Sequence, residues 1–571
     1  MRNIISFKKN IDILESFITD KEWLTIFKIE FLNNQKIEKD IIKYIKNING
    51  VRIDKINFEK IFKDLRKKYY HYEKKASCET NIVNKWKTYR TAYIYYGFIE
   101  VLTEGSIITE KILKHFKRKY KNSYLLELKK IDNDMPSILT NLKAIKLNDN
   151  QKSDKYINIY QIMKKWQDDQ HQFHDEVIEK KFIKYQKEFK EYVFNNYPHL
   201  FNYHDNDLLT LLELDNKPII DLEELEPYIY IGLKNSLTKV IGGKALGLAL
   251  LNHYKFKIPK TYVISVSSLK KMSYLNFVNN INFKSFSVRS SATTEDNKIN
   301  SFAGIFQTKL NIEKKDLLHS IKEVEESQNN EESILYSAHF KTEKPFMSVI
   351  VQEYIEPDFA GVWIGKKIKS GILEYVEGCG ESLVSGKKTP TSEKWPNGTG
   401  LKLKNSFIGE IFINAQKKYK MACDFEWAVK NNTLYWLQYR PVTTNLNYIS
   451  KKSLSLLKAI PTSPGKAQGK PKYFAEPTNN HFEGILLADY TDPKWLNVRC
   501  IRHNNCGRWI LISCCNNCPW IRQAMYLWCW IRNVRWIKKC WFFRNEWRFR
   551  RNKSNQIGTK YKGIFFLWYL I

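Results

Sequence analysis

Acidic residues are scarce in this chain, which has 60 Asp+Glu against 93 Lys+Arg and a formal net charge of +33. A basic excess of this size is often a sign of nucleic-acid binding. Here, however, Lys, Ile and Asn are abundant throughout, as expected of an AT-rich coding sequence, and the basic residues are spread along the chain. We therefore do not expect a nucleic-acid partner.

Cysteine and long apolar runs are also scarce over most of the chain. Before residue 498 there are three isolated cysteines, Cys78, Cys379 and Cys423, which exclude a disulfide framework. There is no apolar run of about 18 residues, which would be needed to span a membrane. The N-terminus has only a short apolar stretch before Lys8, so no secretory signal is visible. These absences predict a cytoplasmic protein without a membrane partner.

Glycine and proline are few in residues 1–227, where apolar residues recur at helical spacing. Ile11, Leu14 and Ile18 are one example, and residues 176–194 form a long amphipathic run with Lys and Glu on its outer face. We predict a helical domain whose role stays open between binding an acceptor and docking a protein. Six tyrosines could line a pocket, although such residues more often form core: Tyr69, Tyr70, Tyr72, Tyr93, Tyr95 and Tyr96.

What the chain does have is a distinctive polar stretch at residues 286–312. The pattern predicts strands at 286–288 and 306–310, joined by a loop that contains Arg289, small hydroxyl residues and an acidic pair. An arginine offers a planar fork to phosphate oxygens, and small residues let backbone N–H groups approach them. The stretch therefore suits a polyphosphate, with an ordinary polar hairpin as the alternative.

The same stretch, V-R-S-S-A-T-T-E-D followed by S-F-A-G, resembles the signature of the nucleotide-binding domain of phosphoenolpyruvate synthase and pyruvate phosphate dikinase. That domain has an ATP-grasp fold. Further matches follow the family's order over residues 238–497, including G-G-K at 242–244 and E-G-C-G-E-S-L-V-S-G at 377–386, where Cys379 replaces the usual leucine. A lysine after a glycine turn at a helix N-terminus is itself suited to phosphate oxygens.

The resemblance implies a set of ATP-binding residues: Lys244, Arg289, Gln352, Glu353, Glu381, Gln438 and Arg440. Among these, Gln352 and Glu353 would lie beside the adenine. Asp424 and Glu426 are spaced so that both project from one face of a strand, which suits a pair of oxygen ligands for Mg²⁺ on ATP. Gln438 and Arg440 repeat that spacing on the next strand. The alternative is an exposed hairpin with alternating charges.

Residues 461–471 and 484–495 resemble the start of the family's phosphohistidine domain, in which a glycine pair and Ser-His-Ala come next. Here the pattern stops, and the carrier histidine is absent as read. Residues 499–571 hold eight of the 16 tryptophans, seven of the ten cysteines, fifteen Lys+Arg and one acid. The cysteines at 506, 514, 515 and 518 could be imagined as zinc ligands, but no second regular pair follows.

A shifted reading frame explains this tail better. Codons can be chosen for Gly507–Pro519 that, read one base later, give V-G-G-Y-L-S-H-A-A-I-I-A-R, which contains the missing motif. We hypothesise a single-base insertion or deletion near residues 497–499.

These observations predict an α+β multidomain protein. Its parts would be a helical domain (1–227), an ATP-grasp domain (228–445), a truncated or frame-shifted phosphohistidine swivelling domain (446–498) and an aberrant tail (499–571). The resemblance implies a dikinase-type phosphotransferase with ATP and Mg²⁺ as cofactors. It would phosphorylate its own histidine and then pyruvate or another small molecule. The acceptor site could lie on a separate chain, because a pyruvate-binding barrel needs roughly 250 residues. The alternatives are an ATP-binding pseudoenzyme and a basic module for nucleic acid or membrane surfaces.

Overall fold

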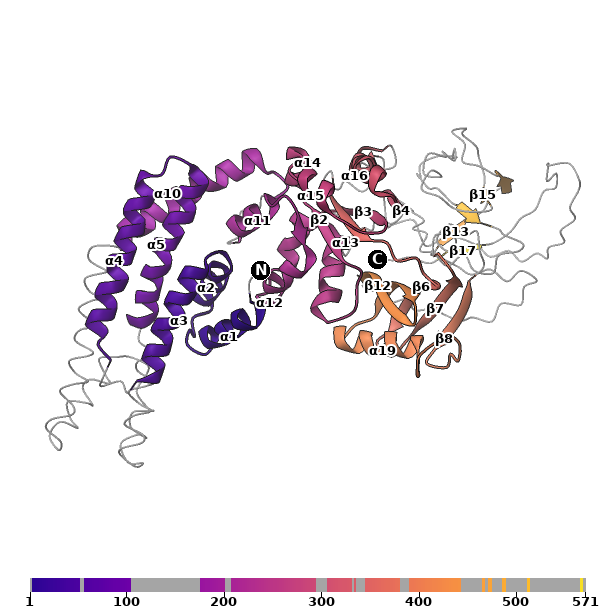
Figure 1. Ribbon diagram of the computed structural model, residues 1–571, viewed down its shortest axis with the longest axis horizontal. Helices are drawn as coiled ribbons and strands as arrows, with labels where there is room; N and C mark the ends of the chain where they lie inside the picture. The colour runs from indigo at the N-terminus through magenta and orange to yellow at the C-terminus, as the bar shows by residue number, and fades with distance from the viewer. Residues whose placement is uncertain are drawn as a thin grey trace, which may run out of the picture. The chain divides into compact units, whose positions relative to one another are not determined.

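The computed structural model describes residues 3–51, 56–103, 175–200, 207–293, 306–330, 333–334, 345–379 and 390–442, and short pieces at 465–467, 471–474, 485–488, 511–513 and 565–567. The chain has two compact units: residues 1–240 with 265–273, and residues 241–264 with 274–571. The first is helical in its described part, and the second contains antiparallel sheets (Figure 1). The protein is thus of mixed helix and sheet, with a helical N-terminal region.

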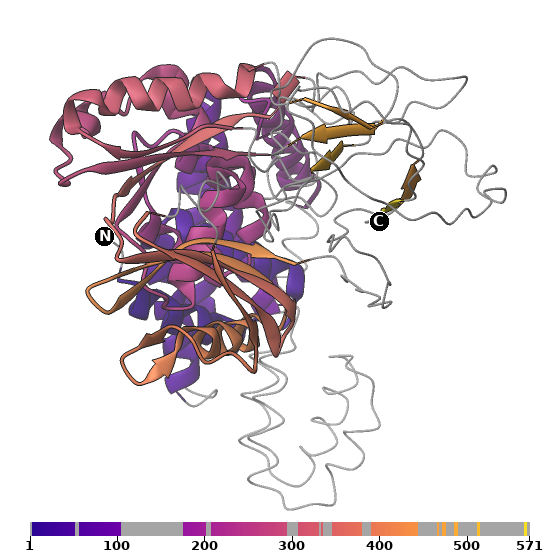
Figure 2. The same ribbon diagram turned by 90° about the vertical axis from the view of Figure 1, so that its right-hand side faces the viewer.

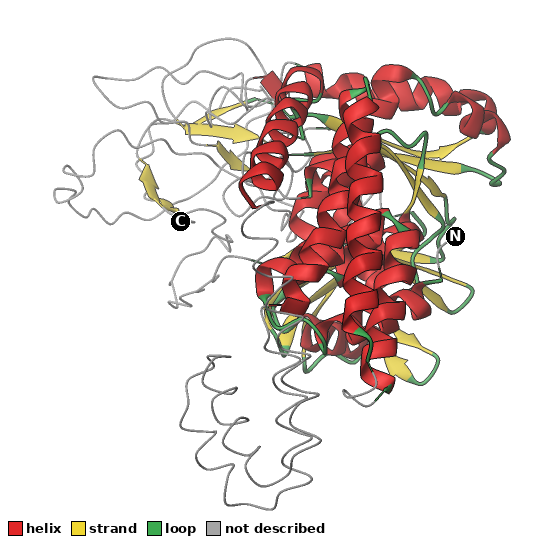
Figure 3. Ribbon diagram, turned by 90° about the vertical axis from the view of Figure 1, so that its left-hand side faces the viewer, coloured by secondary structure: helices red, strands yellow, loops and turns green. Residues whose placement is uncertain are grey.

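The helices of the first unit follow the apolar periodicity of the sequence, and four of them begin at an Asn or Asp whose side chain accepts a backbone N–H. Figure 3 shows them as a helical bundle. They are α1 (Ile4–Glu15), α2 (Lys21–Asn33), α3 (Gln35–Gly50), α4 (Phe58–Cys78), α5 (Ile82–Thr103), α10 (Asp175–Asn196), α11 (Leu208–Asp215) and α12 (Glu226–Tyr230), with β1 (Ile220–Asp221), a 3₁₀ turn (Leu222–Leu225) and α14 (Val266–Lys271). The predicted helical character of residues 1–227 is confirmed for the described residues.

The six tyrosines lie in or beside the core of this bundle. Tyr69, Tyr95 and Tyr96 are buried, and Tyr72 and Tyr93 pack against the same core. Tyr70 is 43% exposed and packs edge-on against Tyr69, with the ring centroids 5.3 Å apart. The expectation that these residues form core is confirmed except at Tyr70.

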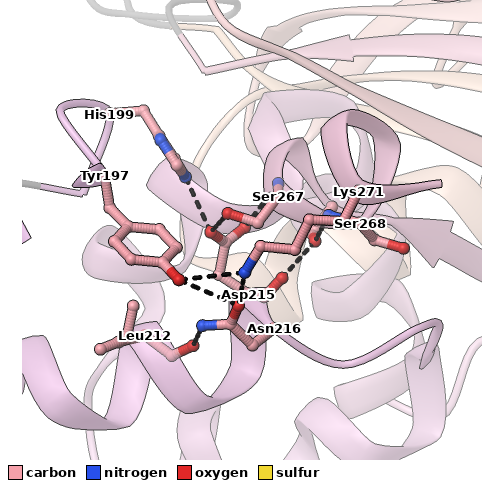
Figure 4. A network of polar contacts seen from close by, with 9 residues as sticks. Tyr197, His199, Leu212, Asp215, Asn216, Ser267, Ser268 and Lys271 are labelled. Atoms are coloured by element: carbon pink, nitrogen blue, oxygen red, sulfur yellow. Dashed lines mark hydrogen bonds and ion pairs between the residues drawn. The ribbon is translucent and has the colours of Figure 1, made fainter. Parts of the chain in front are cut away.

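A buried polar network joins α11 to the segment around α14 (Figure 4). Asp215, the last residue of α11, accepts a hydrogen bond from the Ser267 hydroxyl and lies 2.9 Å from Nε2 of His199. The Ser265 hydroxyl donates to the backbone oxygen of Asp215 at 2.6 Å. Because these residues are fully or almost fully buried, the network satisfies groups that would otherwise be costly to bury. It fastens the α14 segment within the first unit.

Four strands of the second unit pair antiparallel in the first sheet, in the order β2 (Thr261–Ile264), β5 (Met347–Glu353), β3 (Phe286–Ala292) and β4 (Thr308–Ile312). Helix α16 (Leu317–Glu326) packs on it, and α15 (Leu275–Asn280) precedes β3. Strand β3 is longer than predicted and is buried along most of its length rather than on one face. Arg289, Ser290 and Ser291 therefore lie in a strand, not in the expected loop.

The second sheet is also antiparallel, in the order β12 (Thr433–Pro441), β11 (Cys423–Lys430), β6 (Phe359–Lys367), β7 (Ser370–Glu377) and β8 (Thr391–Trp395). The predicted hairpin of β11 and β12 is confirmed, and Asn431 and Asn432 both have positive φ in its two-residue turn. Helix α19 (Ile408–Tyr419) covers one face through Phe412, whose ring packs against Trp363 and Phe425. Figures 1 and 2 show α16 and α19 on the outer sides of the two sheets.

Helix α13 (Lys234–His253) runs from the first unit into the second, and β9 (Lys402–Leu403) and β10 (Ser406–Phe407) form a small hairpin before α19. Later strands are short: β13 (Gly465–Ala467), β14 (Pro471–Tyr473), β15 (Ile485–Ala488), β16 (Leu511–Ser513) and β17 (Phe565–Leu567). Strands β14, β15 and β16 pair in parallel, and β13 pairs antiparallel with β17. Glu381, the four tail cysteines considered for zinc, and most of the tail lie outside the described residues. No helix in the described ranges is both long and apolar enough to cross a membrane.

Candidate nucleotide and metal site

The glycine turn before Lys244 is built against strand β3. Helix α13 kinks at Gly242, whose φ of 73° and ψ of 174° suit glycine almost alone. A Cβ at this position would lie 2.5 Å from the Ser291 Oγ and closer still to the Ser291 carbonyl oxygen. The Ser291 hydroxyl donates to the Ile241 carbonyl at 2.7 Å and accepts from the Ala245 N–H at 3.0 Å. One buried serine therefore holds both sides of the turn.

This turn also positions the Lys244 side chain against strand β3. The Lys244 Nζ donates to the hydroxyl of Ser290, the residue after Arg289, at 3.0 Å. Lys244 is only 8% exposed, so its ammonium group lies in a setting where charges interact more strongly than in water. The sequence suggested that small residues here let backbone N–H groups approach phosphate. In the structure the Ser290 hydroxyl accepts from the Lys244 ammonium group, and the Ser291 hydroxyl holds the glycine turn.

Arg289 joins the two sheets. Its Nη1 donates to the Leu437 carbonyl at 2.7 Å, and its Nη2 donates to Glu426 Oε2 and to Gln438 Oε1, each at 2.8 Å. The side chain is 11% exposed. The arginine thus reaches from β3 in the first sheet to a carboxylate and an amide on β11 and β12 in the second.

The two predicted pairs on β11 and β12 face each other in register, Asp424 opposite Arg440 and Glu426 opposite Gln438. All four residues belong to the alternate positions of these strands that face away from Phe425, the residue packed on α19. The structure brings Arg289, Glu426 and Gln438 into contact, and the Lys244 charge acts on Glu426. Asp424 and Arg440 lie two residues further along the strands.

The two carboxyl groups differ in charge state because their surroundings differ. Burial raises the pKa of Asp424 to about 7, although the Gly365 N–H, which donates to Oδ1 at 3.0 Å, and the Arg440 charge oppose the rise. Burial also acts to raise the pKa of Glu426, but the charges of Arg289, Arg440 and Lys244 outweigh it, and the pKa is lowered. Glu426 is therefore the firmly ionised member of the pair.

The residues expected beside the adenine lie elsewhere on the first sheet. The Gln352 side chain is buried and donates to the Thr261 hydroxyl at 2.8 Å. Glu353 is the last residue of β5, and its backbone N–H donates to the Lys260 carbonyl at 2.9 Å. Among the residues that the structure describes, these two contact Thr261 and Lys260 rather than the cluster around Arg289.

The oxygen atoms of this cluster fit a magnesium ion that is also held by a ligand. Mg²⁺ prefers about six hard oxygen donors and usually takes some from phosphate groups and water. Here Asp424 and Glu426 supply carboxylates, and Gln438 supplies an amide oxygen on the adjacent strand. No group of three or more His, Cys, Asp or Glu suited to a metal occurs in the part of the chain that the structure describes. A magnesium ion held by these three residues would need further oxygen ligands, which water or phosphate groups can supply.

Part of the chain is similar to known proteins. A family model described as the AMP/ATP-binding domain of pyruvate phosphate dikinase matches residues 271–399. A probable phosphoenolpyruvate synthase from Methanothermobacter thermautotrophicus is 30% identical over 236 residues, which cover 33% of this chain and 34% of that protein. Another from Archaeoglobus fulgidus is 28% identical over 262 residues, 36% of this chain and 35% of that protein.

This region of the chain is similar to the corresponding region of the phosphoenolpyruvate synthase and pyruvate phosphate dikinase family. The matches span only about a third of the two relatives' length. A solved D-alanine–D-alanine ligase from Helicobacter pylori is also similar, at 14% identity over 38% of this chain and 60% of that one, but its TM-score of 0.22 is too low to support any argument. The family match contains Arg289, whereas Lys244 and the β11–β12 residues lie outside residues 271–399.

Proposed function

We propose that residues 228–445 form an ATP-grasp domain that binds Mg-ATP, and that the protein is a dikinase-type phosphotransferase. The main observation behind this proposal is that two cationic side chains act on one carboxylate. Arg289 donates hydrogen bonds to Glu426 and Gln438, and the Lys244 ammonium group, held by Ser290, helps to lower the pKa of Glu426. Two cations next to a carboxylate are what a metal–polyphosphate complex requires, because its phosphates need positive charge and its metal needs oxygen ligands. The match of residues 271–399 to the AMP/ATP-binding domain of pyruvate phosphate dikinase supports ATP as the nucleotide.

Within this site each group has a defined task. Lys244, Arg289 and Arg440 would clamp the phosphate oxygens and hold the transferred phosphoryl group in line, since catalysis of this transfer is mostly positioning and charge neutralisation. Asp424 and Glu426 would hold Mg²⁺, which when bound neutralises negative charge on the phosphates. Glu381 and Gln438 would face the nucleotide, and Gln352 and Glu353 would lie near the base.

The acceptor side of the reaction is a further part of the proposal. We take residues 446–498 as the start of a phosphohistidine domain, with the carrier histidine displaced by a shift of frame after residue 497. The β-phosphoryl group of ATP would pass to that histidine with release of AMP, while the γ-phosphoryl group would be transferred to water and leave as inorganic phosphate. The phosphohistidine would then phosphorylate pyruvate or another small acceptor. The helical domain or a separate chain would bind that acceptor.

Mass spectrometry of the phosphorylated protein tests this proposal. The chain as printed and a version with the frame restored after Asn497 would be incubated with Mg²⁺ and ATP labelled at the β-phosphate, then analysed under alkaline conditions. We expect labelled phosphohistidine in the restored protein only. Glu426→Gln should abolish it, whereas Glu323→Gln, a control on helix α16, should leave it intact. Absence of label in both proteins despite bound ATP would contradict the proposal.

A nucleotide-binding role without phosphoryl transfer is the second candidate. It is favoured by one observation, that the printed residues 507–519 contain no Ser-His-Ala motif. If the gene encodes the tail as printed, the chain should bind Mg-ATP and keep no phosphoryl group. Resequencing of the gene around codons 497–499 separates the two candidates.

A further inference from the structure

Nη2 of Arg289 occupies the place where a cation would meet Glu426 and Gln438. It lies 2.8 Å from Glu426 Oε2 and 2.8 Å from Gln438 Oε1. A magnesium ion bound to the same two oxygens would lie about 2.0–2.1 Å from each of them. The nitrogen and the ion cannot both occupy this space, so binding of the metal to this pair requires the guanidinium group to move.

The guanidinium also compensates the charge that would attract a free metal ion. It forms an ion pair with Glu426, in which Nη2 lies 2.8 Å from Oε2. A divalent ion that approaches without a nucleotide therefore meets a carboxylate already paired with a guanidinium group, and it must displace that group in order to bind.

Two donors at this contact lack an acceptor. Nε of Arg289 and Nε2 of Gln438 are buried and have no hydrogen-bond partner among the residues that the structure describes. Gln438 is 2% exposed, so water does not satisfy its amide freely. Unpaired buried donors are costly, and phosphate oxygens are acceptors only. A nucleotide would therefore supply what this arrangement lacks and would give Arg289 a new partner when it leaves Glu426.

We propose that Arg289 closes the cation site of the nucleotide-free protein, so that a divalent ion enters this site only together with a polyphosphate. This inference rests on the proposed function, because it concerns the same site. Metal binding and nucleotide binding are then positively coupled. Bound nucleotide increases the affinity for the metal, and bound metal increases the affinity for the nucleotide by the same factor. Much of that coupling comes from the release of Arg289.

Metal binding without catalysis tests the proposal. Mn²⁺, a paramagnetic stand-in for Mg²⁺, would be titrated into the full chain and followed by electron paramagnetic resonance, with and without a non-hydrolysable ATP analogue. The variants are Arg289→Met, which removes the charge, and Lys309→Met, a control that removes a charge on β4, where Lys309 pairs with Glu323 at 3.1 Å.

Without nucleotide, we expect Arg289→Met to bind Mn²⁺ about tenfold or more tightly than the wild type, because a cation next to the carboxylate is lost. Lys309→Met should match the wild type. The analogue should raise the Mn²⁺ affinity of the wild type strongly and that of Arg289→Met much less. Equal Mn²⁺ affinity of the wild type and Arg289→Met without nucleotide would overturn the proposal.

A second variant keeps the test valid if Arg289→Met does not fold. Glu426→Gln frees Arg289 from its ion pair, so the metal-free analogue should bind this variant more tightly than it binds the wild type. Weaker or equal binding would contradict the closure by Arg289. Failure of the analogue to bind any folded protein, with or without metal, would instead refute the proposed function.

Discussion

Replacement of Gly242 by alanine should disable the site through the backbone. The residue has a φ of 73° and a ψ of 174°, a region that costs other residues about 1–3 kcal/mol. The new Cβ would also overlap the backbone and hydroxyl of Ser291, and such overpacking typically costs about 1–3 kcal/mol more. We expect a loss of roughly 3 kcal/mol in the free energy of unfolding of the second unit, combining both effects.

The control for this prediction is Gly232→Ala. Gly232 also has a positive φ, 96°, but a Cβ there would meet nothing within 4 Å. Its expected cost is only the backbone term, about 1–2 kcal/mol. Urea unfolding followed by tryptophan fluorescence gives both stabilities, and titration with a fluorescent ATP analogue gives the affinities.

Gly242→Ala should weaken nucleotide binding by about tenfold or more, because a misplaced Lys244 loses a charge-assisted phosphate contact. Gly232→Ala should leave the affinity unchanged. If the two variants lose the same stability and bind the analogue equally, the close contact between the glycine turn and β3 is not the constraint described above.

Three further changes test other parts of the structure. Ser291→Ala removes both hydrogen bonds that hold the glycine turn and should cost about 1–3 kcal/mol in urea unfolding, with weaker nucleotide binding; full affinity would contradict the role of Ser291. Phe412→Ala should destabilise the second sheet by about 3–5 kcal/mol, because it empties a fully buried site beside Trp363; a loss below about 1 kcal/mol would be inconsistent with that packing. Burial raises the pKa of Glu30, despite the opposing charge of Arg90, so the folded state binds this proton more tightly than the unfolded state. Stability from this proton is present below the unfolded pKa near 4.5 and is lost as pH rises through the folded pKa; Glu30→Gln should remove that part of the pH dependence of urea unfolding, and an unchanged profile would refute it.

Local pattern was enough to predict the hairpin that carries four of the site residues. Asp424 and Glu426 share a face because strand side chains alternate, and Gln438 and Arg440 follow because a short turn returns the chain in register. The turn itself is at an Asn-Asn pair, whose residues tolerate positive φ better than most. These features depend on residues within twenty positions of one another.

Contacts between distant segments could not be predicted in this way. The partner of Lys244 is Ser290, 46 positions away, and the partners of Arg289 are 137 or more positions away. The orientation of the Gln352 side chain toward Thr261 depends on the pairing of β2 with β5, which no local pattern encodes. The resemblance to a family suggested that these residues act together, but it did not say which atoms meet.

The most direct test of the Mg-nucleotide site is calorimetric titration of a non-hydrolysable ATP analogue into the chain as printed, with Mg²⁺ present. The wild type would be compared with Lys244→Met and with Lys309→Met, which loses a lysine on β4 outside the site. We expect saturable one-to-one binding that Lys244→Met weakens by about tenfold or more and Lys309→Met leaves unchanged. Binding of equal strength in all three proteins, or no binding to the folded wild type, would contradict this expectation.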